Sequence, residues 1–147
     1  MKIYLDCCCL NRPFDDHTQL RVRIEAEAVR SIIDHCRQSG WSLVSSGALD
    51  REILRISNKM RQTQVRELYA VANEHILVNS EVRVRTAYFK EQGLKLFDGM
   101  HLALAEAAGC DVFLTTDDRL FKAAKRLPTK IHVSNPVVWL MEVFPHG

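Results

Sequence analysis

Ile3-Tyr4-Leu5-Asp6 is a short apolar run that ends in a carboxylate, and similar arrangements recur along the chain. The other acidic residues and the apolar runs beside them are Asp98 with residues 99–105, Asp117 and Asp118 with residues 112–116, and Glu52 with residues 41–44. Carboxylates gathered at the edge of a buried sheet repel one another unless a cation neutralises them. The pattern therefore predicts a divalent-metal site, and such a site in turn indicates phosphate chemistry.

The composition is that of an ordinary globular protein. The chain has 147 residues, 47% of them hydrophobic and 26% charged, which predicts a single domain over residues 1–147. The formal net charge of +2 is too small to indicate a nucleic-acid-binding protein by itself. Asp6 interrupts the first apolar run too early for a secretory signal, and no segment approaches the roughly 20 apolar residues that span a bilayer. We therefore expect a cytoplasmic protein without membrane contacts.

The five cysteines do not form a pattern typical of disulfide-rich or zinc-binding proteins. Their number is odd, and Cys7, Cys8 and Cys9 are adjacent rather than spaced as zinc-binding pairs. We interpret the cysteines as small, largely buried residues of a reducing compartment. A zinc or redox role is the alternative.

Short apolar runs alternate with longer amphipathic stretches, which is typical of strands joined by crossover helices in a mostly parallel sheet. The five predicted strands cover residues 2–6, 41–45, 75–78, 111–115 and 131–133, the last at an edge. The predicted helices cover residues 18–38, a stretch from Ser46, residues 60–73, a stretch from Ser80 towards Gly93, residues 97–108, a stretch from Asp117 or Asp118 to about Ala124, and a stretch from Pro136. Residues 11–16 are predicted to form a loop, and the fold class is α/β.

Two helices carry more specific predictions. The spacing in helix 18–38 places one apolar face on Leu20, Ile24, Ala28, Ile32, Ile33 and Cys36. Ser46 and Ser80 are predicted N-caps, and Val82, Val84 and Tyr88 are expected within the helix that Ser80 starts.

Binding sites in open parallel sheets form outside the carboxyl ends of the strands. The four acids Asp6, Glu52, Asp98 and Asp117 could converge there. Mg²⁺ and Mn²⁺ prefer oxygen ligands and activate water for attack on a phosphodiester. No side chain has the pattern of a covalent nucleophile beside a base, so direct hydrolysis is favoured. Taken singly, each acid also has a simpler interpretation as a strand-end turn residue, an N-cap, a first-turn acid or a solvated helix residue.

Three segments together resemble the PIN-domain family, in particular the short bacterial and archaeal PIN proteins that include the VapC toxin ribonucleases. The segments are Ile3-Tyr4-Leu5-Asp6, Asp98-Gly99-Met100-His101-Leu102-Ala103 and Leu114-Thr115-Thr116-Asp117-Asp118-Arg119-Leu120-Phe121. They resemble the family's first strand with its first acid, its third-acid helix, and its Thr-x-Asp segment. The resemblance covers nearly the whole chain.

The resemblance implies the site residues. Asp6, Glu52, Asp98 and Asp117 would be both metal ligands and catalytic residues, with Asp50 as the alternative to Glu52. Supporting roles fall to Thr115, which matches the family's polar residue, and to Asn11, which is expected close to the acidic pocket. The family usually has Thr or Ser directly after its first Asp, whereas this chain has Cys7. Because a thiol is a poorer hydrogen-bond partner, weaker metal binding or turnover is expected.

The resemblance also implies a three-layer α/β/α sandwich, cleavage of RNA with Mg²⁺ or Mn²⁺, and a homodimer. A small antitoxin would be the partner if the protein is the toxin of a toxin–antitoxin pair. The alternative hypothesis is a non-catalytic PIN-like module that binds RNA or a protein. A third hypothesis, a 5′ nuclease acting on DNA, lacks support because the chain shows no long arch or threading insertion.

Other residues are open to two interpretations. His101, three positions after Asp98, is expected as a hydrogen-bonded core residue, with contact to the acidic pocket as the alternative. Basic residues that could meet RNA phosphates, or be only solvated, are Arg12, Arg119 and Lys122, with Arg51, Arg55, Lys59 and Arg61 as a further basic rim near Glu52. No paired aromatic platform for stacking bases is apparent.

Overall fold

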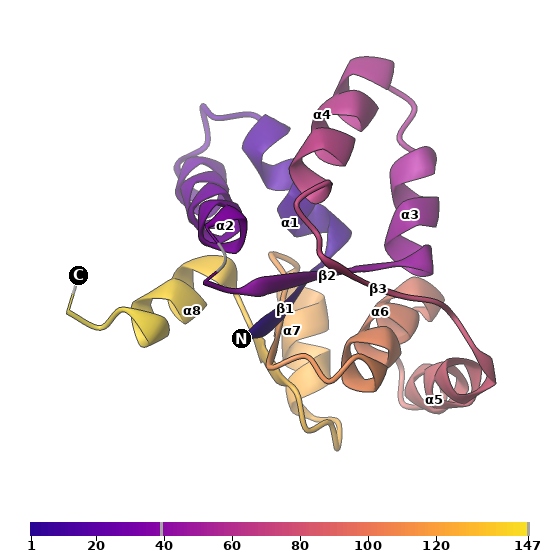
Figure 1. Cartoon of the computed structure of the whole chain (residues 1–147). Coiled ribbons are helices and arrows are strands. Elements are labelled where there is room, and N and C mark those ends of the chain that lie inside the picture. Colours follow the sequence, from indigo (N-terminus) through magenta and orange to yellow (C-terminus); the bar gives the residue numbers. More distant parts are fainter. Residues whose placement is uncertain (39, 147) are drawn as a thin grey trace.

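Five parallel strands form one sheet in the computed structural model, which describes residues 1–38 and 40–146 (Figure 1). The strands are β1 (Lys2–Leu5), β2 (Ser42–Ser46), β3 (Glu74–Ile76), β4 (Val112–Leu114) and β5 (His132–Ser134). Their order is β3-β2-β1-β4-β5, and every neighbouring pair is parallel. The predicted α/β class with a mostly parallel sheet is confirmed, and the fifth strand lies at an edge as predicted.

The order of strands reverses between β1 and β4. The chain steps outward from β1 through β2 to β3 and then returns to the other side of β1 to add β4 and β5. Tyr4 pairs in register with Phe113, and their rings stack with centroids 5.4 Å apart. The two strands therefore end side by side, at the position where open α/β sheets place their sites.

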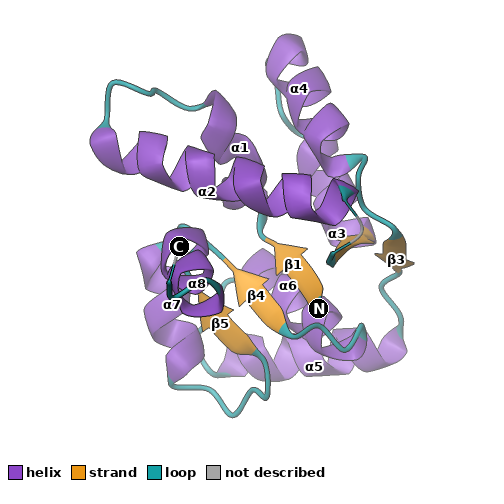
Figure 2. Cartoon of the chain, turned by 60° about the vertical axis from the view of Figure 1, so that its left-hand side comes forward, coloured by secondary structure: helices purple, strands orange, loops and turns teal. Residues whose placement is uncertain are grey.

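Helices cover both faces of the sheet. Within the described residues they are α1 (Cys7–Asn11), the 3-10 helix η1 (Arg12–Phe14), α2 (Leu20–Arg37), α3 (Gly47–Leu54), α4 (Lys59–Tyr69), α5 (Ser80–Glu91), α6 (Leu96–Ala107), α7 (Asp118–Lys125) and α8 (Pro136–Val143). α5, α6 and α7 lie on one side of the sheet and α2 and α4 on the other, and α8 packs against α2 (Figures 1 and 2). This arrangement confirms the three-layer sandwich.

The core follows from this layering. Ile3, Tyr4 and Leu5 in the central strand are at most 1% exposed, because helices cover both of its faces. A strand covered on both sides is a continuous apolar run rather than an alternating one, which is the pattern of β1. Leu102 and Leu104 of α6 are also fully buried.

Residues 7–11 form a helix that was not predicted, and η1 occupies half of the predicted loop 11–16. The strand that was predicted over residues 2–6 ends at Leu5, because Asp6 accepts a hydrogen bond from the Cys7 backbone N–H and caps α1. Cysteine has a low helix propensity, so the triplet gave no helical signal.

The predicted apolar face of α2 was partly wrong. Leu20 and Ile24 are 61% and 44% exposed, whereas the acidic Glu25 is only 2% exposed. The rest of the predicted face is buried. The prediction therefore failed at the start of the helix, where hydrophobicity alone could not place a charged residue on the core side. In α5, similarly, Val84 is 72% exposed.

The predicted helix starts were mostly confirmed. Ser46 caps α3 by accepting a hydrogen bond from the Leu49 backbone N–H, and α8 begins at Pro136. The cap of α5 is Asn79 rather than Ser80.

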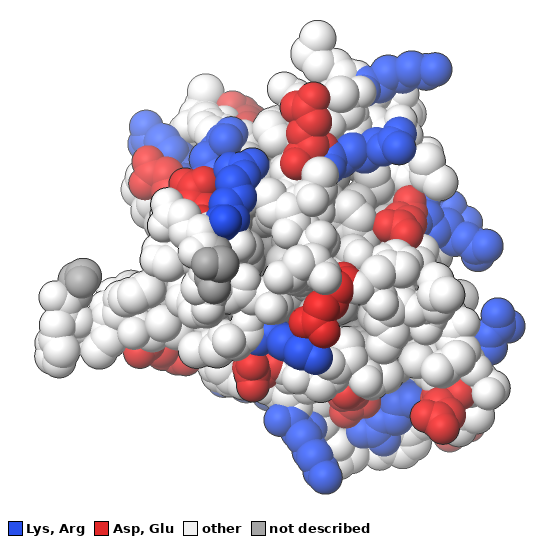
Figure 3. All heavy atoms as spheres, in the orientation of Figure 1, with Lys and Arg blue, Asp and Glu red and all other residues white. Residues whose placement is uncertain are grey.

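The surface of Figure 3 shows Lys and Arg scattered among Asp and Glu, without a single basic tract on that face. This distribution agrees with the small net charge of +2. All five cysteines are free, and Cys8 is the one that is not fully buried. Among the described residues, no helix combines the length and apolar character needed to cross a membrane.

Candidate active site at the carboxyl end of the sheet

Asp6 is the buried centre of the site. Its backbone N–H continues the pairing of β1 with β4 by donating to the Leu114 carbonyl over 3.0 Å. Its Oδ1 accepts from the Cys7 N–H at 2.8 Å, and its Oδ2 accepts from Thr115 Oγ1 at 3.0 Å and from Cys8 Sγ at 3.4 Å. Burial raises the pKa of Asp6, although the charge of His101 opposes that shift. The carboxylate is thus held in place by three donors.

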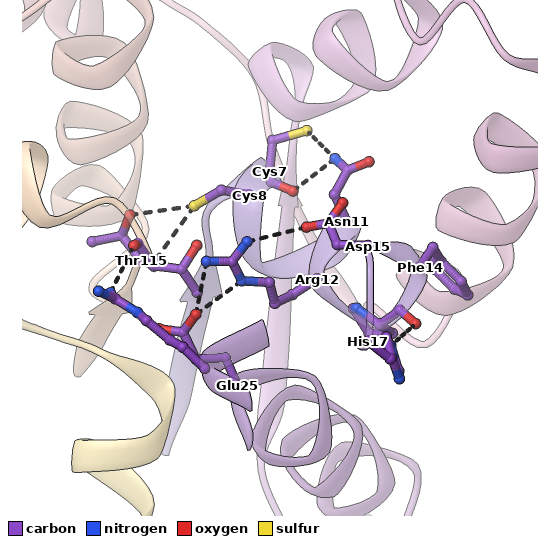
Figure 4. Close-up of polar contacts among 12 residues, drawn as sticks. Cys7, Cys8, Asn11, Arg12, Phe14, Asp15, His17, Glu25 and Thr115 are labelled. Atoms are coloured by element: carbon purple, nitrogen blue, oxygen red, sulfur yellow. Dashed lines mark hydrogen bonds and ion pairs between the residues drawn. The ribbon is translucent and has the colours of Figure 1, made fainter. Parts of the chain in front are cut away.

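Thr115 joins the first and fourth predicted acids. Its hydroxyl donates to Asp6 and accepts from the Asp117 backbone N–H at 3.1 Å. The residue is 1% exposed and directly follows β4, and Figure 4 shows the Cys8 thiol directed at it. Thr115 therefore links the Asp6 carboxylate to the backbone at Asp117.

Asp117 is exposed and serves as the N-cap of α7. Its Oδ1 accepts hydrogen bonds from the Arg119 N–H at 2.9 Å and from the Leu120 N–H at 3.3 Å. The simpler interpretation of this residue as a cap is therefore correct. Its charge also acts on the acidic site, because it contributes to the raised pKa of Asp98.

Asp98 lies half-buried in the first turn of α6, where three negative charges accumulate. Burial raises its pKa to about 6, and the charges of Asp6 and then Asp117 contribute to the shift. His101 and Lys95 oppose it. The fold therefore brings Asp6 and Asp117 close enough for their charges to act on Asp98.

Glu52 reaches the site from α3 and is fixed by a buried chain of hydrogen bonds. His101 Nε2 bonds Glu52 Oε1, and His101 Nδ1 bonds the Tyr4 hydroxyl at 2.6 Å. Tyr4 in turn bonds Ser46 Oγ at 2.7 Å. Because an ionised carboxylate only accepts, Nε2 carries the proton in the bond to Glu52.

This chain explains the electrostatics of Glu52. Burial alone would raise its pKa, but the hydrogen bond and charge of His101 outweigh burial, and the Cys7 thiol adds to the effect, so the pKa is lowered. His101 is fully buried, so its core interpretation and its pocket interpretation are both correct. The sequence analysis did not identify Tyr4 as the partner of His101, nor Ser46 as the partner of Tyr4 in addition to its role as the N-cap of α3.

Asp50, the alternative second acid, lies in a different environment. It accepts from the Tyr69 hydroxyl at 3.0 Å and lies 3.7 Å from His75 Nε2. The geometry therefore favours Glu52 as the acid that faces Asp6.

Asn11 contacts the site indirectly. Its Nδ2 donates to the Cys7 carbonyl at 3.0 Å and lies 3.5 Å from Cys7 Sγ (Figure 4). Its Oδ1 accepts from Arg61 at 3.2 Å. Asn11 therefore supports Cys7, whose thiol faces Glu52, while the thiol that faces Asp6 belongs to Cys8.

A network of ion pairs borders the site on the side of α2. Glu25 pairs with Arg12 at 2.8 Å (Figure 4). It also pairs with Arg21 at 3.2 Å and accepts a hydrogen bond from Asn135 Nδ2 at 2.6 Å. Arg21 also pairs with Asp118 at 2.9 Å. Arg12, which was considered for RNA contacts, instead neutralises a buried carboxylate and holds η1 to α2.

The donor chemistry of the site fits a hard divalent cation. Among residues 1–38 and 40–146, no group of three or more His, Cys, Asp or Glu side chains is arranged to hold a metal ion. Mg²⁺, however, usually takes one or two carboxylates and keeps several waters. The carboxylates of Asp6 and Asp98 provide such a set, since the charge of Asp6 adds to the effect of burial in raising the pKa of Asp98.

Comparisons with known proteins agree with this geometry. The model of the family described as PIN domain matches residues 3–127. A search of curated proteins finds no match. Among solved structures, VapBC2 from Rickettsia felis, crystallised with a DNA fragment from their promoter, is similar with a TM-score of 0.64 and 12% identity, covering 92% of this chain and 98% of that one. PAE2754 from Pyrobaculum aerophilum is similar with a TM-score of 0.56 and 13% identity, covering 100% and 97%. At these identities the two structures support the fold.

Proposed function

The chain belongs to the PIN-domain family, whose members are generally nucleases, and from this premise we propose that it is a metal-dependent endoribonuclease that hydrolyses RNA phosphodiester bonds. The proposal is carried by the gathering of acids at the carboxyl ends of β1 and β4, where burial and then the charges of Asp6 and Asp117 raise the pKa of Asp98 to about 6. A folded protein tolerates such a gathering of carboxylates when a bound cation offsets their repulsion.

In this proposal Asp6, Glu52, Asp98 and Asp117 are the metal ligands and catalytic residues. Thr115 fixes Asp6, His101 fixes Glu52, and Asn11 supports the site through Cys7. Bound Mg²⁺ or Mn²⁺ lowers the pKa of a coordinated water and offsets the charge of the attacked phosphate. Because these hydrogen bonds fix the carboxylates in the folded chain, no rearrangement of the acids is needed when the substrate binds.

We extend the proposal to partners. Similarity to VapBC2, which was crystallised with a DNA fragment from their promoter, supports a role as the toxin of a toxin–antitoxin pair with a small antitoxin as partner. A homodimer is supported by apolar side chains exposed along α2 and α8, namely Leu20, Ile24, Val138, Met141 and Phe144.

Cleavage of a panel of labelled structured RNAs with Mn²⁺ tests the nuclease. Wild type is expected to cut, and Asp6→Asn to lower the rate by more than about 100-fold. The control is Asp34→Asn, which changes an exposed acid paired with Arg37 on α2. Equal cleavage by wild type and Asp6→Asn would assign the activity to a contaminant.

A second candidate function is a non-catalytic PIN-like module that binds RNA or a protein. The observation in its favour is Cys7 in place of the hydroxyl residue that family members carry. Calorimetric titration with Mn²⁺ separates the two candidates, because no binding even at millimolar metal would favour the second.

A further inference from the structure

A cleft beside two of the acids has one wall that the proposed chemistry does not use. Its volume is about 440 Å³, within the roughly 300–1,000 Å³ typical of small-ligand sites. The lining residues are Cys7, Glu52, Arg55, Ile56, Phe97 and Asp98. Glu52 and Asp98 thus form a carboxylate wall, and the remaining wall includes two planar groups, the Arg55 guanidinium and the Phe97 ring.

Arg55 and Phe97 form a stacked pair in that wall. The guanidinium carbon of Arg55 lies 5.3 Å from the centroid of the Phe97 ring. Behind it, Phe97 packs on the buried His101 ring with centroids 6.2 Å apart. Phe97 is therefore held from the core side by the same histidine that fixes Glu52.

The guanidinium of Arg55 is available to a ligand. Arg55 is exposed, and its guanidinium makes no hydrogen bond or ion pair within the part of the chain that the structure describes, although its charge helps to lower the pKa of Glu52. By contrast, Arg12, Arg21 and Arg61 each pair with carboxylates. A guanidinium supported by an aromatic ring presents a flat, cationic surface next to the acids.

We propose that the Arg55–Phe97 pair is a stacking subsite for an unpaired nucleobase of single-stranded RNA. The inference rests on the proposed function, because it places the base next to the phosphate that Glu52 and Asp98 serve. Single-stranded RNA is recognised largely by stacking of its bases on aromatic rings and arginine planes. A ring and a guanidinium beside carboxylates would take the base, while the acids and their cation take the phosphate.

Binding to a short labelled uridine oligonucleotide tests the subsite by fluorescence anisotropy in EDTA. A matching set of oligonucleotides carries one abasic nucleotide at a time. Because abasic RNA keeps every phosphate, the comparison cancels the electrostatic contribution to binding. Wild type is expected to lose about fivefold to 100-fold in affinity when one particular base is removed.

Variants then assign that base to the pair. Phe97→Leu keeps the apolar volume and is expected to bind intact and abasic RNA equally. Arg55→Lys keeps the charge but not the plane, and should lose most of the same difference. Arg51→Lys, an exposed arginine on the same helix, is the control and should keep it. Circular dichroism confirms that each variant is folded.

Three outcomes decide the matter. Base-dependent binding that survives in Phe97→Leu would overturn the subsite. If wild type binds no RNA, both the subsite and the proposed substrate are wrong. Binding of a peptide with an aromatic side chain in place of RNA would then indicate a protein partner. Base-dependent binding without cleavage in the Mn²⁺ assay would leave the subsite standing and remove the nuclease.

Discussion

At the scale of single residues, Asp98 lies in an environment that disfavours its ionised form. Its pKa of about 6 arises from burial and from the charges of Asp6 and Asp117. Since the folded-state pKa lies above the value for an unfolded chain, the folded protein binds more protons between those two values. Stability is therefore lost as the pH rises through that window, and the ionised Asp98 destabilises the metal-free protein near neutral pH.

Asp98→Asn is expected to stabilise the metal-free protein near pH 7. The gain should be on the order of 1 kcal/mol, after allowance for solvent screening of a half-buried group, and should shrink towards about pH 4. Thermal unfolding in EDTA at several pH values measures it. The control is Asp34→Asn, and an equal gain in both variants would contradict the crowding of charges at the site.

The Tyr4–His101 bond is expected to hold Glu52 in its ligand position. Tyr4→Phe removes the hydroxyl that bonds both His101 Nδ1 and Ser46 Oγ, so it should lower stability by about 1–3 kcal/mol. It should also weaken Mn²⁺ binding about tenfold, because a partner that orients a metal ligand has been lost. Calorimetric titration measures the affinity.

Tyr69→Phe is the matched control for this prediction. The Tyr69 hydroxyl accepts a hydrogen bond from the Ser46 backbone N–H at 2.9 Å. It donates to the Asp50 carboxylate rather than to His101. It should lose stability without loss of Mn²⁺ affinity. Identical affinities in Tyr4→Phe and wild type would show that the histidine does not depend on Tyr4.

The residues that sequence could identify are those with a local signal. Asp6 and Asp117 follow apolar runs, Thr115 lies two positions before Asp117, and Ser46 precedes an amphipathic stretch. The link from Glu52 to His101 could not be found in this way, because the two residues are 49 positions apart and meet only through packing of α3 on α6.

At the scale of helices and strands, the same distinction holds. The helices with clear caps, such as those after Ser46 and Asn135, begin within a residue of their predicted positions. α1 was missed because three cysteines have no helical pattern and a single aspartate both ends β1 and caps the helix. The start of the apolar face of α2 was misplaced because Glu25 is buried there. Its burial depends on the ion pair with Arg12, which forms only in the tertiary structure.

The close contact between α5 and α6 is expected to place Asp98. A Cβ at Gly99 would lie 3.2 Å from Phe89 Cβ and 3.5 Å from the Thr86 carbonyl. Gly99→Val should therefore force the helices apart and lower stability by roughly 2 kcal/mol, since overpacking typically costs about 1–3 kcal/mol. Thermal unfolding measures this loss, and the Mn²⁺ affinity should fall with it because Asp98 is the preceding residue.

Gly47→Val is the control, because a Cβ at this helix start has no neighbour within 4 Å. Its stability should change much less than that of Gly99→Val. A loss of the same size in both would mean that the cost is a property of the backbone and not of the contact between α5 and α6.

At the scale of the whole molecule, the sheet order explains why distant acids meet. The reversal between β1 and β4 brings residues 109 positions apart into the bond from Thr115 to Asp6. The crossover through α5 and α6 then returns Asp98 to the same edge. Strand order itself was not predictable from the chain, although the alternation of elements restricted it to a parallel sheet with sites at one edge.

The surface that α2 and α8 form together leads to the last prediction, which concerns assembly. Leu20 and Ile24 of α2 and Val138 of α8 line one groove, and Met141, one helical turn after Val138, is 69% exposed. Contiguous exposed apolar side chains of this kind mark interaction surfaces. Light scattering after gel filtration is expected to give twice the 16.9 kDa of one chain, and Met141→Lys should shift it to the single-chain mass. Val84→Lys, 72% exposed on α5 at the other side of the sheet, should remain dimeric. A single-chain mass for wild type would contradict the dimer. Dissociation by Val84→Lys but not by Met141→Lys would place the interface on α5 instead.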